Sequence, residues 1–335
     1  MNIRFAMLAF AAAAALVVGC GGGDVSATET GPPPRKEGSR KAWITLDGNQ
    51  TPANIGILMA EKRGFFDDVG IEATITTPVV PENALAYLEE GSIDFAVSSQ
   101  PEVALKRDRG APVIAVGSVI GQPTAAMIWL KRSKIHGLAD LAGKTIAVPR
   151  PFSRRLLEIV LGRVGLSLED VEVKRVIYDL MPTLVSGRAD AIFGGSWNLE
   201  GAALEARGLE PVVTPVEALG VPGYDELVIA ARSAFAAKDP ALVRDFLAAV
   251  AEGTAAAVVD PEAAAALLDK SVEADTWLSR KETEAELEAT LPLLSRTGHM
   301  DSGRADRLVD WMYAHDLLQR PMPASELLTN SYLGS

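Results

Sequence analysis

Two stretches of the chain resemble each other: LEEGSIDFAVSS at residues 88–99 and LVSGRADAIFGG at residues 184–195. Both read Leu-x-x-Gly-x-x-Asp, followed by an apolar run that ends in small residues. A glycine after a helical stretch predicts a helix C-cap, and small residues after a strand suit an edge that a ligand approaches closely. One such match can also arise by chance, because Gly-x-x-Asp is frequent at helix-to-strand turns. We expect two equivalent lobes.

The sequence around these stretches predicts an α/β fold. Short apolar runs with the pattern of buried strands alternate with helical stretches, which favours strands that run mostly parallel and helices that cover each sheet. The expected strands lie at residues 42–46, 71–75, 95–97 and 113–116, and the expected helices between them include 56–63 and 81–89. Each lobe should therefore hold a mixed sheet flanked by helices.

Two extended runs, residues 125–130 and 225–231, are candidates for the places where the chain crosses between lobes. We therefore expect residues 41–127 to begin the first lobe, 128–224 to form the second, and 225–335 to return to the first. The returning segment is rich in alanine, and Asp-Pro pairs at 239–240 and 260–261 predict helix starts. It should form a helical C-terminal region.

The N-terminal segment has the pattern of an export signal. Arg4 precedes an apolar run at residues 5–18, which is too short to span a bilayer as a helix. The ending Val-Val-Gly before Cys20 resembles a bacterial lipoprotein box, so we expect residues 1–19 to be removed and Cys20 to carry lipid. Residues 20–40 are rich in Gly and Pro and should form a flexible tether. The body would then be extracytoplasmic and anchored to a membrane surface.

Composition excludes several classes of function. The formal net charge is −12, which makes the chain a poor partner for nucleic acid or anionic lipid. Cys20 is the only cysteine, so an internal disulfide, a CxxC metal site and a second thiol are excluded. His136, His299 and His315 lie far apart without partners at metal-ligand spacing, and neither a phosphate loop nor a Gly-x-Ser-x-Gly motif occurs. We expect no metal, no cofactor and no catalytic residues.

Several motifs resemble the type II periplasmic binding proteins, and within them the group that binds pyrimidine precursors of thiamine. They are LDGNQTPANIG at 46–56, SSQPEV at 98–103, GQP at 121–123, DLAGK at 140–144, WNLEG at 197–201 and LGVPGYDELV at 219–228. The resemblance implies a monomeric two-lobed protein that closes on a small-molecule ligand and delivers it to the permease of an ABC importer. The leading ligand is a hydroxymethyl- or formylaminopyrimidine.

Two positions depart from that group. Gly48 stands where an aromatic residue is usual, and Asn54 stands where histidine is frequent. A riboflavin-like or sulfonate-like ligand therefore remains an alternative. The resemblance extends to a pyrimidine synthase, but that enzyme's pattern includes a cysteine-rich motif and the opening-loop histidine. A tethered sensor that signals to a membrane kinase is a further alternative.

The candidate ligand contacts are polar and aromatic residues in loops that follow the expected strands, because ligands of α/β sheets gather there. Asp47 and Glu200 are the candidate carboxylates, although a helix cap and a solvated residue are the respective alternatives. Phe152 and Trp197 are candidates for stacking on the ligand or for the core. The full set is Asp47, Asn49, Asn54, Ser99, Gln122, Phe152, Ser153, Trp197, Asn198, Glu200, Tyr224 and Glu226.

Two charged segments remain to be interpreted. Arg150, Arg154 and Arg155 suit either a phosphate on the ligand or a solvated helix start. The run at residues 280–286 alternates acidic and basic side chains and predicts a solvated helix face.

Overall fold

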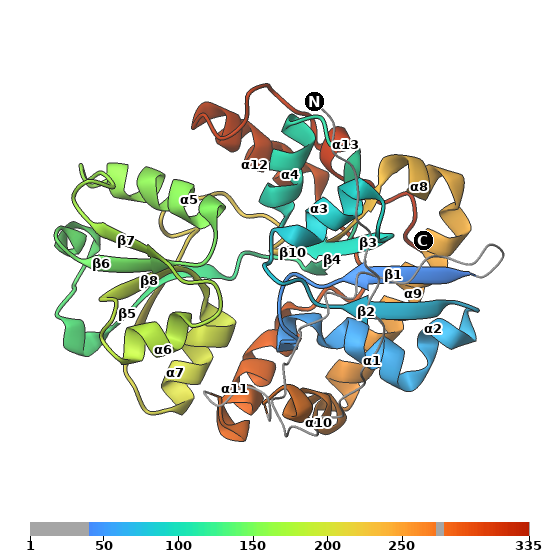
Figure 1. Cartoon of the computed structure of the whole chain (residues 1–335), viewed down its shortest axis with the longest axis horizontal. Helices are drawn as coiled ribbons and strands as arrows, with labels where there is room; N and C mark the ends of the chain where they lie inside the picture. Colours follow the sequence, from blue (N-terminus) through green and yellow to red (C-terminus); the bar gives the residue numbers. More distant parts are fainter. Residues whose placement is uncertain (1–39, 273–277, 335) are drawn as a thin grey trace, which may run out of the picture. The chain divides into compact units, whose positions relative to one another are not determined.

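The computed structural model describes residues 40–272 and 278–334. The expected signal segment, Cys20 and residues 20–39 of the expected tether lie outside this range. The described residues form two five-stranded mixed sheets with helices on their faces (Figure 1). The predicted α/β class with two lobes is confirmed.

The first lobe contains the sheet β2-β1-β3-β10-β4. Its strands are β1 (Lys41–Thr45), β2 (Glu72–Thr76), β3 (Phe95–Ser98), β4 (Val113–Ile120) and β10 (Leu227–Arg232). Strand β1 pairs in parallel with β2 and β3, whereas β10 is antiparallel to both β3 and β4.

The second lobe repeats this arrangement in the sheet β7-β6-β8-β5-β9. Its strands are β5 (Ala125–Leu130), β6 (Thr145–Val148), β7 (Glu172–Arg175), β8 (Ala191–Ser196) and β9 (Pro211–Pro215). Strand β6 is parallel to β7 and β8, and β5 is antiparallel to β8 and β9. In each lobe, therefore, the strand that enters from the other lobe is the antiparallel one.

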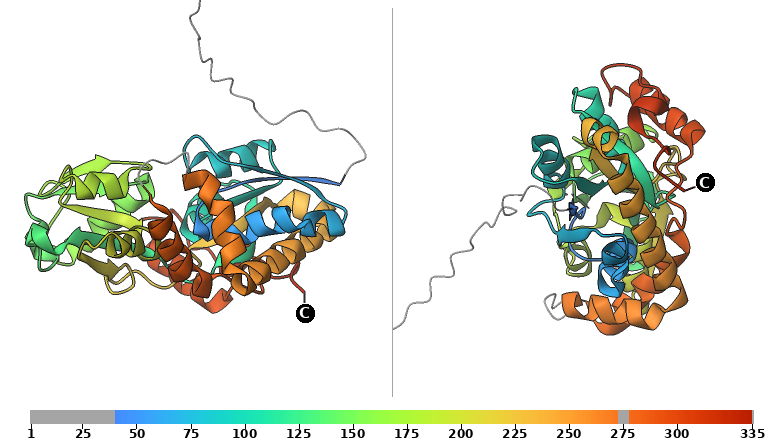
Figure 2. Two further views of the ribbon diagram at one scale, coloured as in Figure 1. Left: turned by 90° about the horizontal axis from the view of Figure 1, so that it is seen from below. Right: turned by 90° about the vertical axis from the view of Figure 1, so that its right-hand side faces the viewer.

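Helices cover both faces of the first sheet (Figures 1 and 2). One face packs against α1 (Ile55–Arg63), α2 (Phe65–Asp68), α8 (Ser233–Lys238), α9 (Pro240–Val259) and α10 (Pro261–Val272). The other packs against α3 (Asn83–Glu90), α4 (Gln100–Asp108), α12 (Ser302–Ala314) and α13 (Ala324–Leu327). Both faces are buried, which explains why β3 reads as a continuous apolar run rather than an alternating one.

The second sheet is covered by α5 (Pro151–Gly162) on one face and by α6 (Leu180–Val185) and α7 (Ala202–Ala206) on the other. A π-helical turn, η4 (Trp197–Gly201), precedes α7. The remaining named elements are the short 3-10 helices η1 (Pro52–Asn54), η2 (Lys131–Ser133), η3 (Leu138–Leu141) and η5 (Leu291–Leu293).

The repeated sequence motif has the same structural role in both lobes. Gly91, the C-cap of α3, and Gly187, which follows the C-cap of α6, have φ values of 83° and 72°. The carboxylate of Asp94 accepts the backbone N–H of Trp43 at 3.1 Å, and that of Asp190 accepts the backbone N–H of Thr145 at 2.9 Å. In each lobe the motif therefore binds its strand to the neighbouring parallel strand, which is consistent with the two equivalent lobes that the similarity of the two stretches predicted.

The predicted lobe boundary at 127/128 is wrong by a few residues. All six residues of β5 belong to the second sheet, so the first crossing lies between the end of β4 at Ile120 and the start of β5 at Ala125. The extended run was recognised, but it is a strand of one lobe and not the crossing itself. The return crossing ends where β10 begins, at Leu227.

The C-terminal region returns to the first lobe, but α11 (Arg280–Thr290) also contacts the second (Figure 1). Glu282, Thr283 and Glu286 of this helix are buried. The expectation of a solvated face is therefore wrong for these three residues, whereas Arg280, Lys281 and Glu284 are exposed as expected. The physical reason at Glu282 is pairing: its carboxylate receives both Arg207 Nε and Arg207 Nη2, and it also accepts the backbone N–H of Ser279.

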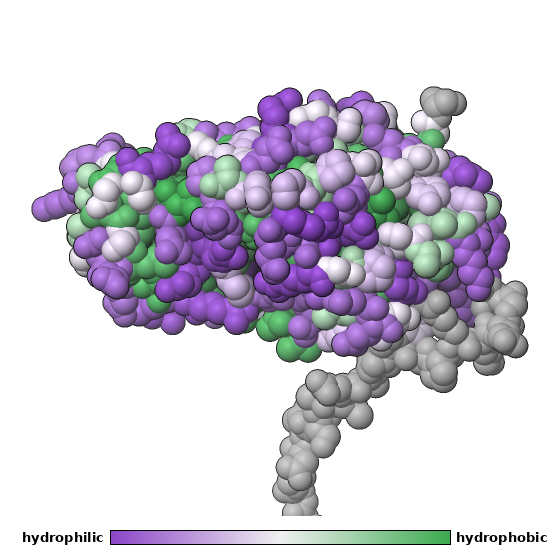
Figure 3. Space-filling model, turned by 90° about the horizontal axis from the view of Figure 1, so that it is seen from above, coloured by the Kyte–Doolittle hydropathy of each residue, from purple (hydrophilic) through white to green (hydrophobic). Residues whose placement is uncertain are grey.

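The surface is mainly hydrophilic on the face in Figure 3, with small groups of hydrophobic residues mostly over the second lobe. Within residues 40–272 and 278–334, none of the helices is both long and apolar enough to cross a bilayer.

Candidate ligand-binding site

A cavity of about 880 Å³ is lined by residues of both lobes. Its walls come from the loops that follow β1, β3, β6 and β8, from the two crossings, and from α11. These are the carboxyl ends of parallel strands, where α/β proteins collect ligands. The volume lies in the range of pockets for small organic molecules.

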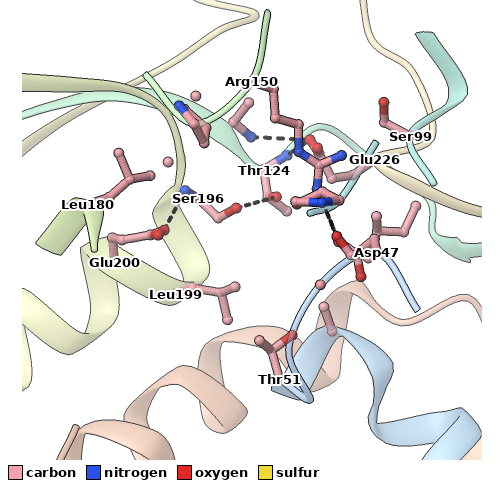
Figure 4. Close-up of a pocket in the computed structure, with 18 of the residues that line it drawn as sticks. Asp47, Thr51, Ser99, Thr124, Arg150, Leu180, Ser196, Leu199, Glu200 and Glu226 are labelled. Carbon is pink, nitrogen blue, oxygen red and sulfur yellow. Dashed lines mark hydrogen bonds and ion pairs between the residues drawn. The ribbon is translucent and has the colours of Figure 1, made fainter. Parts of the chain in front are cut away.

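Arg150 lies within this cavity and joins the lobes (Figure 4). It precedes α5 at the end of β6, and its Nη1 donates to Glu102 Oε2 of the first lobe at 2.7 Å. Its Nη2 lies 3.3 Å from the backbone oxygen of Asp47 and 3.5 Å from Asp47 Oδ2. Burial alone lowers the pKa of Arg150, but the carboxylates of Glu102, Asp47 and Glu226 raise it above its usual value. The guanidinium is a fixed positive charge.

Asp47 is positioned from its own lobe by Asn54. The Asn54 amide donates to Asp47 Oδ1 at 3.0 Å, and Asn54 is completely buried. Asn54 therefore holds the carboxylate and does not line the cavity, which corrects the prediction of a ligand contact. Asp47 Oδ2 lies 3.5 Å from Nη2 of Arg150, so this oxygen is directed toward the cavity that both residues line (Figure 4).

Glu200 faces the cavity from the second lobe. Its Oε2 accepts the backbone N–H of Ser196 at 2.6 Å, and the Ser196 hydroxyl accepts from Thr124 Oγ1 at 3.2 Å (Figure 4). Burial raises the pKa of the Glu200 carboxyl, and the hydrogen bond from Ser196 opposes that rise only in part. The carboxyl is therefore closer to neutral than a solvated glutamate and is sensitive to a donor brought by a ligand.

Glu226 links the two crossings through hydrogen bonds. Its Oε2 accepts the backbone N–H groups of Thr124 at 2.7 Å and Ala125 at 3.2 Å. Burial raises the pKa of the Glu226 carboxyl, while these two hydrogen bonds lower it. The neighbouring Tyr224 is buried, and burial holds the pKa of its phenol well above the usual range. The cavity therefore has a protonated phenol and a carboxyl on the side where the chain crosses between the lobes.

Nine of the predicted contacts line the cavity: Asp47, Asn49, Ser99, Phe152, Ser153, Asn198, Glu200, Tyr224 and Glu226. Three do not, namely Asn54, Gln122 and Trp197. Gln122 is exposed on the first crossing. The Trp197 ring packs against the core of the second lobe, and its Nε1 donates to the backbone oxygen of Pro123 at 3.2 Å. The π-helical turn directs the residues after Trp197 toward the cavity instead.

The sequence prediction missed several residues of the lining. Glu102 was recognisable in principle, because Ser99 and Glu102 have the spacing of a capping box, and the Ser99 hydroxyl does accept the Glu102 N–H at 3.3 Å. Tyr178, Thr283 and Glu286 carry no local signal, since they reach the cavity only through the packing of distant segments.

The lining is acidic. It contains the carboxyl groups of Asp47, Glu102, Asp179, Glu200, Glu226 and Glu286. Among the lining residues that the structure describes, Arg150 is the only basic side chain, and it is already paired with Glu102. Such a cavity favours a ligand that is positively charged or rich in hydrogen-bond donors over an anion.

Two sheets of identical strand pattern, joined by two crossings with a cavity between them, are the features of the type II periplasmic-binding-protein fold. The alkanesulfonate-binding protein SsuA of Xanthomonas axonopodis pv. citri, solved with MOPS bound, has the same fold: the TM-score is 0.67 at 19% identity, over 87% of this chain and 98% of that one. The chain belongs to the NMT1/THI5-like family, whose model matches residues 51–264.

Relatives in this family have two kinds of name. The formylaminopyrimidine-binding protein of Halalkalibacterium halodurans is 29% identical over 294 residues, which are 86% of this chain and 89% of that one. The 4-amino-5-hydroxymethyl-2-methylpyrimidine phosphate synthase of Schizosaccharomyces pombe is 25% identical over 232 residues, 67% of each chain. The chain is thus similar to binding proteins over more of its length than to this enzyme.

Proposed function

We propose that this protein is the solute-binding component of an ABC importer and that it captures a small aminopyrimidine precursor of thiamine. The observation that carries this proposal is the charge of the cavity. Six carboxyl groups line it, and Arg150, the one basic side chain among the lining residues that the structure describes, is paired with Glu102. A hydroxymethyl- or formylaminopyrimidine offers an amino group beside a ring nitrogen, and a carboxyl group can pair with both.

The positions of Asp47 and Glu200 support this ligand class. The two carboxyls line the cavity from opposite lobes, so one flat ligand that pairs with both would favour the closed arrangement. The same lining argues against a sulfonate, because its charge would meet several carboxylates and only one arginine. The similarity to sulfonate-binding proteins is therefore one of fold.

Binding without catalysis is the function that the site residues favour. Asn54 stands where the synthases of the resemblance have histidine, and its amide is used to hold Asp47. With Cys20 as the only cysteine, a cysteine-rich motif is excluded by the sequence. We further propose that Cys20 carries the lipid anchor, that the folded body is extracytoplasmic, that the protein is monomeric, and that its partner is a membrane permease.

The test is a binding screen by thermal shift and calorimetry on the purified protein. The panel contains 4-amino-5-hydroxymethyl-2-methylpyrimidine, its formylamino analogue, thiamine, riboflavin and a short alkanesulfonate. A ligand at 100 times its dissociation constant adds about 2.7 kcal/mol to the free energy of unfolding. We expect a shift with the aminopyrimidines, and its loss in Asp47→Asn and Glu200→Gln.

The matched control is Glu172→Gln, which removes an exposed carboxylate on β7 away from the cavity. It should bind like the unchanged protein. A shift with the sulfonate and none with the pyrimidines would contradict the proposal, as would a Glu200→Gln variant that binds a pyrimidine with unchanged affinity.

A further inference from the structure

The loop after β7 reaches from the second lobe to the first at two points. The Tyr178 hydroxyl donates to the backbone oxygen of Val79 at 3.1 Å, with the backbone oxygen of Pro78 at 3.4 Å. At the end of β7, just before this loop, Arg175 Nη2 contacts Glu82 Oε1 at 2.8 Å. Both acceptor segments lie between β2 and α3 of the first lobe. These contacts exist only while the two loops face each other.

The Tyr178 ring also lines the cavity, next to Gly48 of the opposite lobe. A Cβ atom on Gly48 would lie 3.7 Å from Tyr178 Cε1, so the ring lies directly against the backbone that follows β1. Tyr178 is 45% exposed. The other aromatic side chains of the described lining are committed to packing: Phe193 and Tyr224 are buried, and Phe152 packs against the core.

The charged groups around Tyr178 leave its hydroxyl able to donate. Burial raises the pKa of the phenol, Arg150 lowers it, and Glu82 and Asp47 raise it, with a net rise. The phenol is therefore protonated at neutral pH and can keep the hydrogen bond to Val79.

We propose that the Tyr178 ring contacts the ligand at the opening of the cavity, and that the hydrogen bond from its hydroxyl to the backbone oxygen of Val79 holds the two lobes together and slows ligand release. This hydrogen bond is called the latch below. The proposal rests on the proposed function and adds to it a specificity residue. It implies a flat heteroaromatic ligand, because a half-exposed ring offers its face to another ring. It also predicts that loss of the hydroxyl speeds dissociation of the ligand and that loss of the ring lowers the affinity.

The experiment compares Tyr178→Phe with Tyr178→Ala in stopped-flow binding of 4-amino-5-hydroxymethyl-2-methylpyrimidine, followed by tryptophan fluorescence. Phe keeps the ring and removes the hydroxyl, so we expect dissociation about 3- to 10-fold faster with an unchanged association rate. Ala removes both, so affinity should fall about 10- to 100-fold. The melting temperature without ligand should change little in Tyr178→Phe, which separates a latch from a general loss of stability.

A matched control is Arg175→Gln. It removes the neighbouring exposed ion pair and should leave dissociation within about twofold, because exposed pairs contribute little. If Tyr178→Phe releases the ligand at the unchanged rate while the unsubstituted protein binds, the latch is refuted and the proposed function stands.

If the unsubstituted protein binds none of the pyrimidines, the proposed function fails, and the latch is then tested without ligand. Hydrogen exchange at the amides of residues 77–82 and 176–179 should be faster in Tyr178→Phe than in the unchanged protein. Equal exchange in the two proteins would overturn the latch as well.

Discussion

Gly194 is the position where a single methyl group should have the largest measurable effect on the cavity wall. Its φ is +83°, a conformation that costs an L side chain about 1 to 2 kcal/mol. An added Cβ would also lie 2.5 Å from Ser153 Oγ and 2.8 Å from Ser153 Cβ, and such an overlap costs about 1 to 3 kcal/mol. Gly194→Ala should therefore lower the free energy of unfolding by about 2 to 5 kcal/mol.

Thermal unfolding measures this directly. A cooperative unit of roughly 300 residues has an unfolding entropy of about 0.6 kcal/mol/K, so the melting temperature should fall by about 3 to 8 °C. Ser153→Gly removes the overlap but not the backbone strain. The double variant should thus recover about 1 to 3 kcal/mol relative to additive single changes.

Gly48→Ala is the matched control, because its φ is not positive and its nearest contact is 3.7 Å. Its melting temperature should stay close to that of the unchanged protein. A Gly194→Ala protein that melts within 1 °C of the unchanged one would refute both the strain and the overlap. Additivity with Ser153→Gly would refute the overlap alone.

Three further predictions concern the repeat, α11 and pH. Asp94→Ala leaves the buried Trp43 N–H without its acceptor and should lower the free energy of unfolding, measured with denaturant, by about 1 to 3 kcal/mol. Asp94→Asn keeps an acceptor oxygen and should lower it by less. Equal losses in the two variants would contradict this role. Arg207→Ala leaves Glu282 buried without its cation and should lower the free energy of unfolding by about 1 to 3 kcal/mol, a range reduced because Arg207 is partly exposed. Arg207→Lys should recover only part of this loss, since lysine cannot pair through two N–H groups of a guanidinium. Full recovery by lysine would show that charge alone matters. Because burial raises the pKa of Glu200 and Glu226 in the folded protein, the folded state holds more protons than the unfolded one above pH 4.5, and stability from these groups falls as pH rises through their folded pKa. Glu200→Gln and Glu226→Gln should therefore gain stability relative to the unchanged protein as pH rises, and melting curves from pH 4 to 8 that run parallel for all three would contradict the raised pKa.

The repeat allowed the two-lobed fold to be predicted from the sequence because its residues act locally. Gly91 and Gly187 supply the left-handed turn at the end of a helix, and Asp94 and Asp190 accept a backbone N–H of the adjacent strand, so each copy of the motif has the same local structural role. The lobe boundary was harder to predict. The sequence of β5 has the extended pattern of any buried strand, and nothing within it states which sheet it joins.

The lining of the cavity was predictable where a loop directly follows a strand, as at Asp47, Ser153 and Glu200. It was not predictable where a residue's environment depends on a distant partner. Trp197 looked suited to the cleft because of its small and polar neighbours, but the π-helical turn places its ring on the core. Glu282 looked solvated because the arginine that neutralises it lies 75 residues earlier.

The placement of α11 has a consequence for comparing this protein with its relatives. The match to the family model ends at residue 264, whereas Leu278, Thr283 and Glu286 of the lining come later in the chain. One wall of the cavity is thus encoded outside the segment by which membership of the family is recognised. Two members of the family could have the same lining residues within the matched segment and still differ in the side chains that α11 places in the cavity. Exchanging residues 278–290 between relatives would show how much ligand preference is carried by this one helix.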